Sequence, residues 1–463
     1  MARSWWTLAG ACTGLFILML DSTVVALALP SIREDVGADA TGLQWVMNAY
    51  LLAIAVLVIT AGRLGDMFGR KRLFLIGMCV FALGSVVSGA ATGELTLIGG
   101  RVLQGVGAAP MLPLSLAIVC NAFPAQQQAR ALGIWAGISA VALGIGPLAG
   151  GALVDLEWRL IFWINLPIAF VGIAIMARFA PESTDPESGR SVDVPGLATL
   201  SLGLTAVVLA LVQARVWGAA ASAGLAVVGL LSLVAFWRIE HRSREPIVEF
   251  SLFRNGPYFG ASAAAFALVG SYWVVMFFQP QYLQDVRGHS AVESGLMILP
   301  VTVPMIFVSP FSGRLIARFG ARALMSAGMA CGVLGLLALT QIDAGSSYAL
   351  LLAGYLPFGI ALGLVYAPMS TAAMAAMPAE KVGIASGVLA MDRVMAGAIA
   401  LAATGAIFHA LQGGGSSFSA AVAGSTWALV ALCAVGTILT WRFVRDSDRP
   451  VPEPHADHRR FHL

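Results

Sequence analysis

Charged residues are scarce in this sequence. Only 11% of its 463 residues are Asp, Glu, Lys or Arg, whereas a soluble domain usually carries about 25%. Hydrophobic residues make up 59%, which is more apolar surface than a water-soluble fold can bury. The net charge of +3 is small, and no basic stripe with interleaved aromatics points to nucleic acid. The chain is therefore expected to lie in a lipid bilayer.

Motifs for enzymatic or cofactor chemistry are also missing. The five cysteines stand singly in apolar stretches, without the spacing of a metal site. There is no Walker motif, and the apolar runs hold neither a His/Glu metal cluster nor a Ser/His/Asp set. No loop is long enough for a sensory domain. The sequence thus argues against an enzyme or a receptor, and it predicts no metal, no cofactor and no obligate protein partner.

Long apolar runs, by contrast, are abundant. About 20 apolar residues are needed for a helix to cross a bilayer, and about fourteen runs approach that length. The first is too long for a signal peptide and contains Asp21, so it is expected to remain as a span. The sequence predicts an all-α integral membrane protein of the cell membrane. Its spans are expected at 7–29, 43–61, 73–91, 96–120, 129–153, 160–178, 194–214, 219–238, 257–283, 293–313, 322–341, 347–376, 383–408 and 424–443.

The charges of the loops orient these helices. Cytoplasmic loops collect Lys and Arg. With the N-terminus inside, roughly 21 of the 27 Lys and Arg residues fall on the cytoplasmic side. The bias persists to Arg442, Arg445 and Arg449. Both termini are therefore predicted to be cytoplasmic.

Two loops repeat one pattern, which indicates a duplicated architecture. The loop GRLGDMFG begins at Gly62, and GRLIARFG begins at Gly313. A chance match between two Gly- and Arg-rich loops is the alternative. Duplicated halves are common in secondary transporters, and six helices per half leave one pair between them. The predicted division is a six-helix bundle at 1–180, a linker with two inserted helices at 181–256, a second six-helix bundle at 257–445, and a disordered cytoplasmic tail at 446–463.

Six motifs follow one another along the chain. They are LDSTVVALALP at 20–30, GRLGDMFGRKR at 62–72, RVLQGVGAA at 101–109, GIGPLAGG at 144–151, the WR and NLP of 158–167, and the segment 281–300. In this order they resemble the motifs of the major facilitator superfamily, in particular its fourteen-helix drug:proton antiporter family. Two positions depart from that family's usual residues, with Ala26 in place of Asn and Ala142 in place of Gly.

The resemblance implies a fold and a function. The fold is the major facilitator fold, with two six-helix bundles and an inserted helix pair. The function is the export of amphipathic, cationic or neutral drugs in exchange for protons, by alternating access. The same motifs would serve a dedicated exporter of one endogenous natural product, and the sequence does not separate the two. The expected partners are a small-molecule substrate, protons and the lipid bilayer.

Two charges within the apolar runs are candidates for proton coupling. Asp21 lies about eight residues from the outer end of its run, or roughly 12 Å, and Arg101 lies roughly 9 Å from the outer end of the fourth run. Charges in lipid are costly, so both are expected to face the bundle interior and to pair there. Burial disfavours a charged carboxyl and a nearby arginine favours it, so a moving gate can switch its proton. A permanent bridge that only fixes helix packing is the alternative.

A second charged position lies in the thirteenth run. Asp392 is predicted to be a second proton site or a contact for a cationic substrate, and simple neutralisation of a nearby cation is the alternative. Arg393 matches an arginine usual in the family. The predicted substrate cavity comprises Gln104, Gln279, Tyr282, Asp392 and Arg393.

Two groups of small and charged residues are predicted to control the conformation. In the 62–72 loop, Gly62, Asp66, Gly69 and Arg70 are expected to form a cytoplasmic latch that holds one state of the two halves. A mere topology signal would not explain Asp66. In the fifth run, small residues and a proline are expected to let helices approach closely and to seal the interface between the halves, with ordinary packing as the alternative. These residues are Gly146, Pro147, Gly150 and Gly151.

Overall fold

All regular structure in the described part of the chain is helical. The computed structural model describes residues 2–184, 193–243, 246–378 and 381–445, so the predicted tail at 446–463 lies outside it. Fourteen helices there are long and apolar enough to cross a membrane, which confirms the predicted count. In chain order the helices are α1 Ala2–Val36, α2 Ala40–Phe68, α3 Arg70–Gly89, α4 Glu94–Ala122, α5 Ala125–Leu156, α6 Leu160–Trp163, α7 Asn165–Phe179, α8 Val194–Val212, α9 Ala214–Glu240, η1 Phe250–Arg254, α10 Gly256–Gln281, η2 Tyr282–Val286, α11 Ala291–Val308, η3 Ser309–Phe311, α12 Ser312–Phe319, α13 Ala321–Leu339, α14 Tyr348–Ala375, α15 Val382–Gly413 and α16 Phe418–Phe443.

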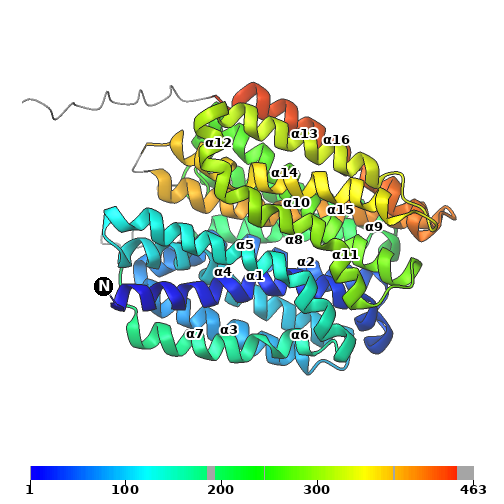
Figure 1. Ribbon diagram of the computed structural model, residues 1–463, viewed down its shortest axis with the longest axis horizontal. Coiled ribbons are helices and arrows are strands. Elements are labelled where there is room, and N and C mark those ends of the chain that lie inside the picture. Colours follow the sequence, from blue (N-terminus) through cyan, green and yellow to red (C-terminus); the bar gives the residue numbers. More distant parts are fainter. Residues whose placement is uncertain (1, 185–192, 244–245, 379–380, 446–463) are drawn as a thin grey trace, which may run out of the picture.

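The helices pack as two similar bundles. In the first, α1 contacts α4, α5 and α7, while α3 contacts α4 and α7. In the second, α10 contacts α14, α15 and α16, while α13 contacts α14 and α16. The same scheme therefore recurs from α1–α7 to α10–α16, and Figure 1 shows the two bundles one above the other. The residue boundaries given for the domains stay a prediction, as does the orientation in the membrane, from which we take the terms outer and cytoplasmic.

The inserted pair is formed by α8 and α9. These helices pack against each other, and α8 also contacts α2 of the first bundle and α15 of the second. Apolar side chains on α9 such as Leu230, Leu231 and Trp237 are exposed, as expected for a surface that faces lipid. The pair therefore lies beside the junction of the two bundles.

A surface ion pair joins the segment after α9 to the start of α15. Glu249 accepts hydrogen bonds from the Lys381 ammonium and from the Ser251 hydroxyl. The Lys381 bond, ahead of the Ser251 bond, lowers the pKa of Glu249 below its ordinary value. The pair therefore stabilises the fold above that ordinary value, and this contribution is lost as the pH falls through the lowered pKa.

Replacing Glu249 by Gln is expected to cause a small loss of stability. Both side chains are partly exposed, so the loss at pH 7 should be at most about 1 kcal/mol. In acid, where the carboxyl is protonated, the variant and the wild type should unfold alike. Thermal unfolding followed by circular dichroism at the two pH values checks this. An equal loss at both would show that the Lys381 charge pair is not the cause.

Candidate functional site

The centre of the first bundle holds a buried ion pair. Arg101 Nη1 on α4 lies 2.6 Å from Asp21 Oδ2 on α1, and both side chains are fully buried. The structure thus brings together the two charges that the sequence places at matched depth. A charge this far from water persists only when a partner and hydrogen bonds compensate for its lost solvation.

Polar side chains from three other positions complete the cluster. Gln104 donates to Asp21 Oδ1 at 3.0 Å and accepts from Arg101 Nη1 at 2.7 Å. Asn165 on α7 donates to the same Oδ1 at 3.1 Å. Ser85 on α3 accepts from the Gln104 amide at 2.9 Å. The carboxylate therefore meets donors from two helices, α4 and α7, and α3 supports them.

The arginine is held from α2. Its Nε donates to the Val46 carbonyl at 3.1 Å, and its guanidinium carbon lies 4.2 Å from the Tyr50 ring centroid. Close approach of α2 and α4 depends on Gly105, where an added Cβ would lie 2.7 Å from the Tyr50 carbonyl oxygen. Arg101 Nη2 is buried and has no hydrogen-bond partner among the described residues. The side chains of the cluster are therefore closed off from solvent, and one donor group, Arg101 Nη2, has no hydrogen-bond partner among the described residues.

Sequence reasoning missed several members of this cluster. Ser85, Asn165 and Tyr50 were not assigned to the site. Asn165 stands inside one of the quoted motifs, and an amide within an apolar run is itself a signal for a polar partner. The sequence predicts Gln104 in the substrate cavity, but its amide is used within the ion-pair cluster.

The second buried carboxylate lies in the other bundle. Asp392 on α15 is 8% exposed, and Ser262 on α10 donates to its Oδ2 at 2.6 Å. Arg393 is partly buried, and its guanidinium carbon lies 5.2 Å from the ring centroid of Tyr366 on α14. The adjacent charges thus have different partners, as expected for helical neighbours that point about 100° apart.

Two residues assigned to the substrate cavity have other partners in this structure. Tyr355 on α14 donates to Gln279 Oε1 at 2.6 Å, and both side chains are buried. Tyr282 donates to the Asp343 carbonyl, in the loop between α13 and α14, at 2.6 Å. Gln279 therefore joins α10 to α14, and Tyr282 joins η2 to the loop after α13. This geometry gives no support to a role in binding substrate.

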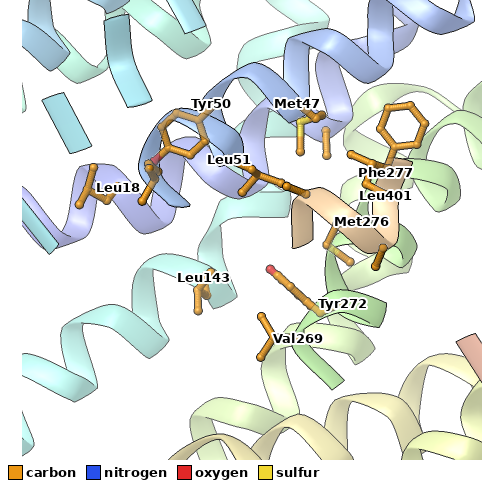
Figure 2. Close-up of a cluster of buried hydrophobic side chains, with 14 of the residues drawn as sticks. Leu18, Met47, Tyr50, Leu51, Leu143, Val269, Tyr272, Met276, Phe277 and Leu401 are labelled. Atoms are coloured by element: carbon orange, nitrogen blue, oxygen red, sulfur yellow. The ribbon is translucent and has the colours of Figure 1, made fainter. Parts of the chain in front are cut away.

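A small apolar cavity lies between the bundles. Its wall comes from α5, α10, α11 and α14, and we call it the central cavity. Tyr272 is 8% exposed, and its hydroxyl has no hydrogen-bond partner among the described residues. Figure 2 shows that hydroxyl directed into the space beside Leu143 of α5. The lining residues are Leu143, Val269, Tyr272, Thr302, Met305, Leu362 and Tyr366.

The two bundles touch closely where α5 meets α11, a contact that we call the outer seam. A Cβ added at Gly151 would lie 2.6 Å from the Ala291 carbonyl oxygen, and one added at Gly295 would lie 2.2 Å from the Pro147 carbonyl oxygen. The Ala291 amide also donates to Asp155 Oδ1 at 3.0 Å. Backbone contact of this kind is possible only where side chains are absent.

The other glycines of the same motif face the first bundle. A Cβ added at Gly146 would lie 1.8 Å from Thr23 Oγ1, and one added at Gly150 would lie 2.9 Å from the Val24 Cα. These glycines therefore bring α5 against α1. Only part of the predicted sealing group, Pro147 and Gly151, lies in the seam itself.

Comparison with known proteins places this architecture in a family. The model of the Major Facilitator Superfamily matches residues 11–401. The chain belongs to the major facilitator superfamily. It is accordingly a transporter and not an enzyme, and it is a multi-pass protein of the plasma membrane that moves small molecules.

Relatives of this transporter include resistance proteins. The multidrug resistance protein Stp of Mycobacterium tuberculosis is 36% identical over 408 residues, which cover 87% of this chain and 76% of that protein. The tetracenomycin C resistance and export protein of Streptomyces glaucescens is 32% identical over 414 residues, which cover 89% and 77%. The xylose transporter XylE from E. coli shares the fold, with a TM-score of 0.66 at 14% identity over 96% of this chain and 99% of that one.

The predicted latch of this transporter is built within the first bundle. Arg70 Nε at the start of α3 lies 2.7 Å from Asp66 Oδ1 near the end of α2. Gly69, at φ +115°, makes the turn between α2 and α3.

Glu182, which follows α7, accepts from the backbone amides of Lys71 and Arg72 at 2.9 and 3.1 Å. It thereby caps α3, as a carboxylate at a helix N-terminus should, and a Cβ added at Gly69 would meet it at 2.8 Å. An added Cβ at Gly62, by contrast, would make an ordinary contact with Pro113 at 3.6 Å.

Proposed function

We propose that this transporter exports amphipathic drug-like molecules, cationic or neutral, in exchange for protons and by alternating access. The relatives named for multidrug resistance and for tetracenomycin C export support this class of substrate. A dedicated exporter of one endogenous natural product is the alternative, since relatives named for a single compound, such as a cephamycin export protein, also match. A panel of unrelated compounds separates these two readings.

The buried Asp21–Arg101 pair carries the proposal. Arg101 Nη2 has no partner among the described residues, so the guanidinium keeps a donor for a second arrangement. The cluster is also fully buried in this conformation, so a proton can reach Asp21 only when the bundle opens. An intramembrane carboxylate with a movable partner is the group that a proton-exchanging transporter needs.

In this proposal, proton exchange follows from a change of partner at the Asp21 carboxylate, between Arg101 and a proton. In the present conformation the Asp21 carboxylate is paired with Arg101 and accepts from the Gln104 and Asn165 amides. When the outer seam opens and the arginine moves away, a proton from outside replaces the arginine as its partner. Opening toward the cytoplasm then lets the proton leave on that side as the arginine returns, and the cluster is buried again in the present conformation. Inward proton movement supplies about 1.4 kcal/mol per pH unit and about 2.3 kcal/mol per 100 mV.

Asp392 is proposed to assist in the second bundle. The adjacent charge, Arg393, lies over the Tyr366 ring in a cation–π contact. Tyr366 lines the central cavity. Asp392 is not among the residues that line the central cavity, and Ser262 of α10 donates to it. A cationic substrate would therefore meet this carboxylate only after α10 and α15 move apart. Service as a second proton site and contact with a cationic substrate are the two roles that we propose for it.

Everted membrane vesicles with an acidic lumen test the proposed function. Their cytoplasmic face is outside, so the wild type should accumulate added ethidium, and a proton carrier should release it. Vesicles without the protein set the background. Accumulation that persists after the proton gradient is collapsed would contradict proton exchange. Accumulation of only one compound from a panel would favour the dedicated exporter.

Replacing Tyr272 by Phe is expected to weaken transport of substrates that carry carbonyl acceptors. The unpartnered hydroxyl is buried beside the central cavity in this conformation. It can donate one hydrogen bond once the cavity opens to admit substrate, so its loss should raise the KM for doxorubicin about tenfold. Ethidium has no carbonyl group, so its KM should not change. Initial rates over a range of concentrations measure both values. An equal rise for the two compounds would show that the hydroxyl has only a structural part.

A further inference from the structure

The two bundles meet a second time where α2 of the first packs against α15 of the second. Contact there is close, because a Cβ added at Gly405 of α15 would lie 1.9 Å from Gln44 Nε2 of α2. Gln44 lies near the start of α2, and Gly405 lies toward the end of α15. In the predicted orientation this contact therefore belongs to the outer half of the molecule, as the outer seam does.

A buried histidine follows on the same face of α15. His409 comes four residues after Gly405, and residues at this spacing lie one above the other on a helix. Its side chain is 6% exposed, and neither ring nitrogen has a hydrogen-bond partner among the described residues. The inserted pair also reaches α15, through α8 and α9. The imidazole is thus enclosed near the junction of both bundles with the inserted pair.

Two charges act on this imidazole from other elements. They are Asp39, which caps α2, and Arg215 at the start of α9. Of the other helices that pack against α15, α8, α10 and α14 contain no Asp, Glu, Lys, Arg or His, and α16 contains only Arg442 near its cytoplasmic end. On α15 itself no other charged residue follows Arg393. One positive and one negative charge therefore act on the ring, and neither group hydrogen-bonds to it.

The closed outer side accordingly holds this histidine in its neutral form. An imidazolium enclosed here would lose its hydration without gaining a hydrogen-bonded partner, which is costly. Once α2 and α15 separate, the ring meets water, where a histidine takes up a proton near pH 6.5. The open arrangement then binds one more proton than the closed one, so a falling pH favours the open arrangement.

We propose that His409 is a pH sensor that biases the outer side of the transporter toward opening in acid. In its neutral form the ring lets α2 and α15 close over it, and in its protonated form it must lose a proton before they close. The proposal rests on alternating access, but it does not depend on proton exchange at Asp21. His409 sets how often the outer side opens, whereas Asp21 carries the exchanged proton.

Distances across the outer side test the pH sensor. Spin labels at Thr92→Cys and Ala344→Cys, in exposed outer loops of the two bundles, are measured by pulsed electron paramagnetic resonance. The sample is the full chain in nanodiscs, with the five native cysteines replaced by alanine. The label separations give the ratio of open to closed protein with His409 present and with His409→Gln. Other titrating groups, such as Asp21, cancel in the quotient of the two ratios, which should rise about tenfold from about pH 7.5 to about pH 5.5.

His289→Gln is the matched control. It makes the same change in a partly exposed outer loop, where the ring can take up a proton without any opening, so its quotient should stay constant. A constant quotient for His409→Gln as well would overturn the proposal. Should His409→Gln fail to fold, His409→Phe keeps a ring of similar size that cannot titrate, and it takes the place of the first variant.

Added ethidium separates this failure from a failure of alternating access. Label distances that change with ethidium, together with a constant quotient for His409→Gln, would contradict the pH sensor alone. Distances that change neither with ethidium nor with pH would contradict both the pH sensor and the alternating access on which it rests.

Discussion

Asp21→Asn should abolish accumulation of substrate against a gradient. One pH unit supports about a tenfold concentration ratio for each exchanged proton, and a side chain that cannot take up a proton supports none. The change also leaves the buried Arg101 without its charge partner, which typically costs about 3–5 kcal/mol. Loss of transport must therefore be separated from loss of folding. Uptake of ethidium into everted vesicles, normalised to folded protein, is the measurement.

Two variants make that separation. Asp21→Asn combined with Arg101→Gln removes both charges, so it should fold more stably than the single variant and still fail to accumulate substrate. Asp343→Asn makes the same chemical change in an exposed loop and should transport like the wild type. Gradient-driven uptake by the double variant would show that the pair serves only to fix the helices.

Gly151→Val should disable transport by a different route. The new side chain would press on the Ala291 carbonyl and the Val292 Cα, at 2.6 and 2.8 Å from the position of its Cβ. Backbone atoms cannot move aside as a flexible side chain can, so the outer seam cannot close fully. Overpacking costs about 1–3 kcal/mol, and each 1.4 kcal/mol shifts a two-state population about tenfold. We expect export to fall about tenfold or more and protons to leak.

The control for this variant is Gly99→Val. Gly99 also lies in a membrane-spanning helix, but no atom lies within 4 Å of an added Cβ there. Both substitutions therefore carry the same change in helix propensity, and only one obstructs the seam. Proton leak is followed with a pH-sensitive dye trapped in proteoliposomes. Equal transport and equal leak in the two variants would mean that the seam is not the gate.

The fold was predictable because it follows from composition and periodicity along the chain. Each run of apolar residues has to become a helix in lipid, since no other open structure satisfies its backbone. The ion pair was predictable for a related reason. Two charges at one depth, each costly alone, lower their free energy by meeting.

The surroundings of that pair were less accessible to sequence reasoning. Polar residues in apolar runs were assigned to a substrate cavity, yet Gln279 and Tyr282 each find a partner on a neighbouring element. Which partner a buried amide finds depends on how the helices are rotated, and spacing in one helix does not fix that. Glu182 illustrates the same limit, because its linker gave no sign that it would cap α3.

The most direct test of the account is to measure proton movement and substrate movement together. Proteoliposomes with a trapped pH dye, and no initial pH gradient, are given an outward gradient of substrate. Proton exchange predicts that the lumen acidifies as substrate leaves, in a fixed ratio to it, and that Asp21→Asn abolishes this acidification. Substrate that leaves with no change of luminal pH, or with alkalinisation, would contradict the account.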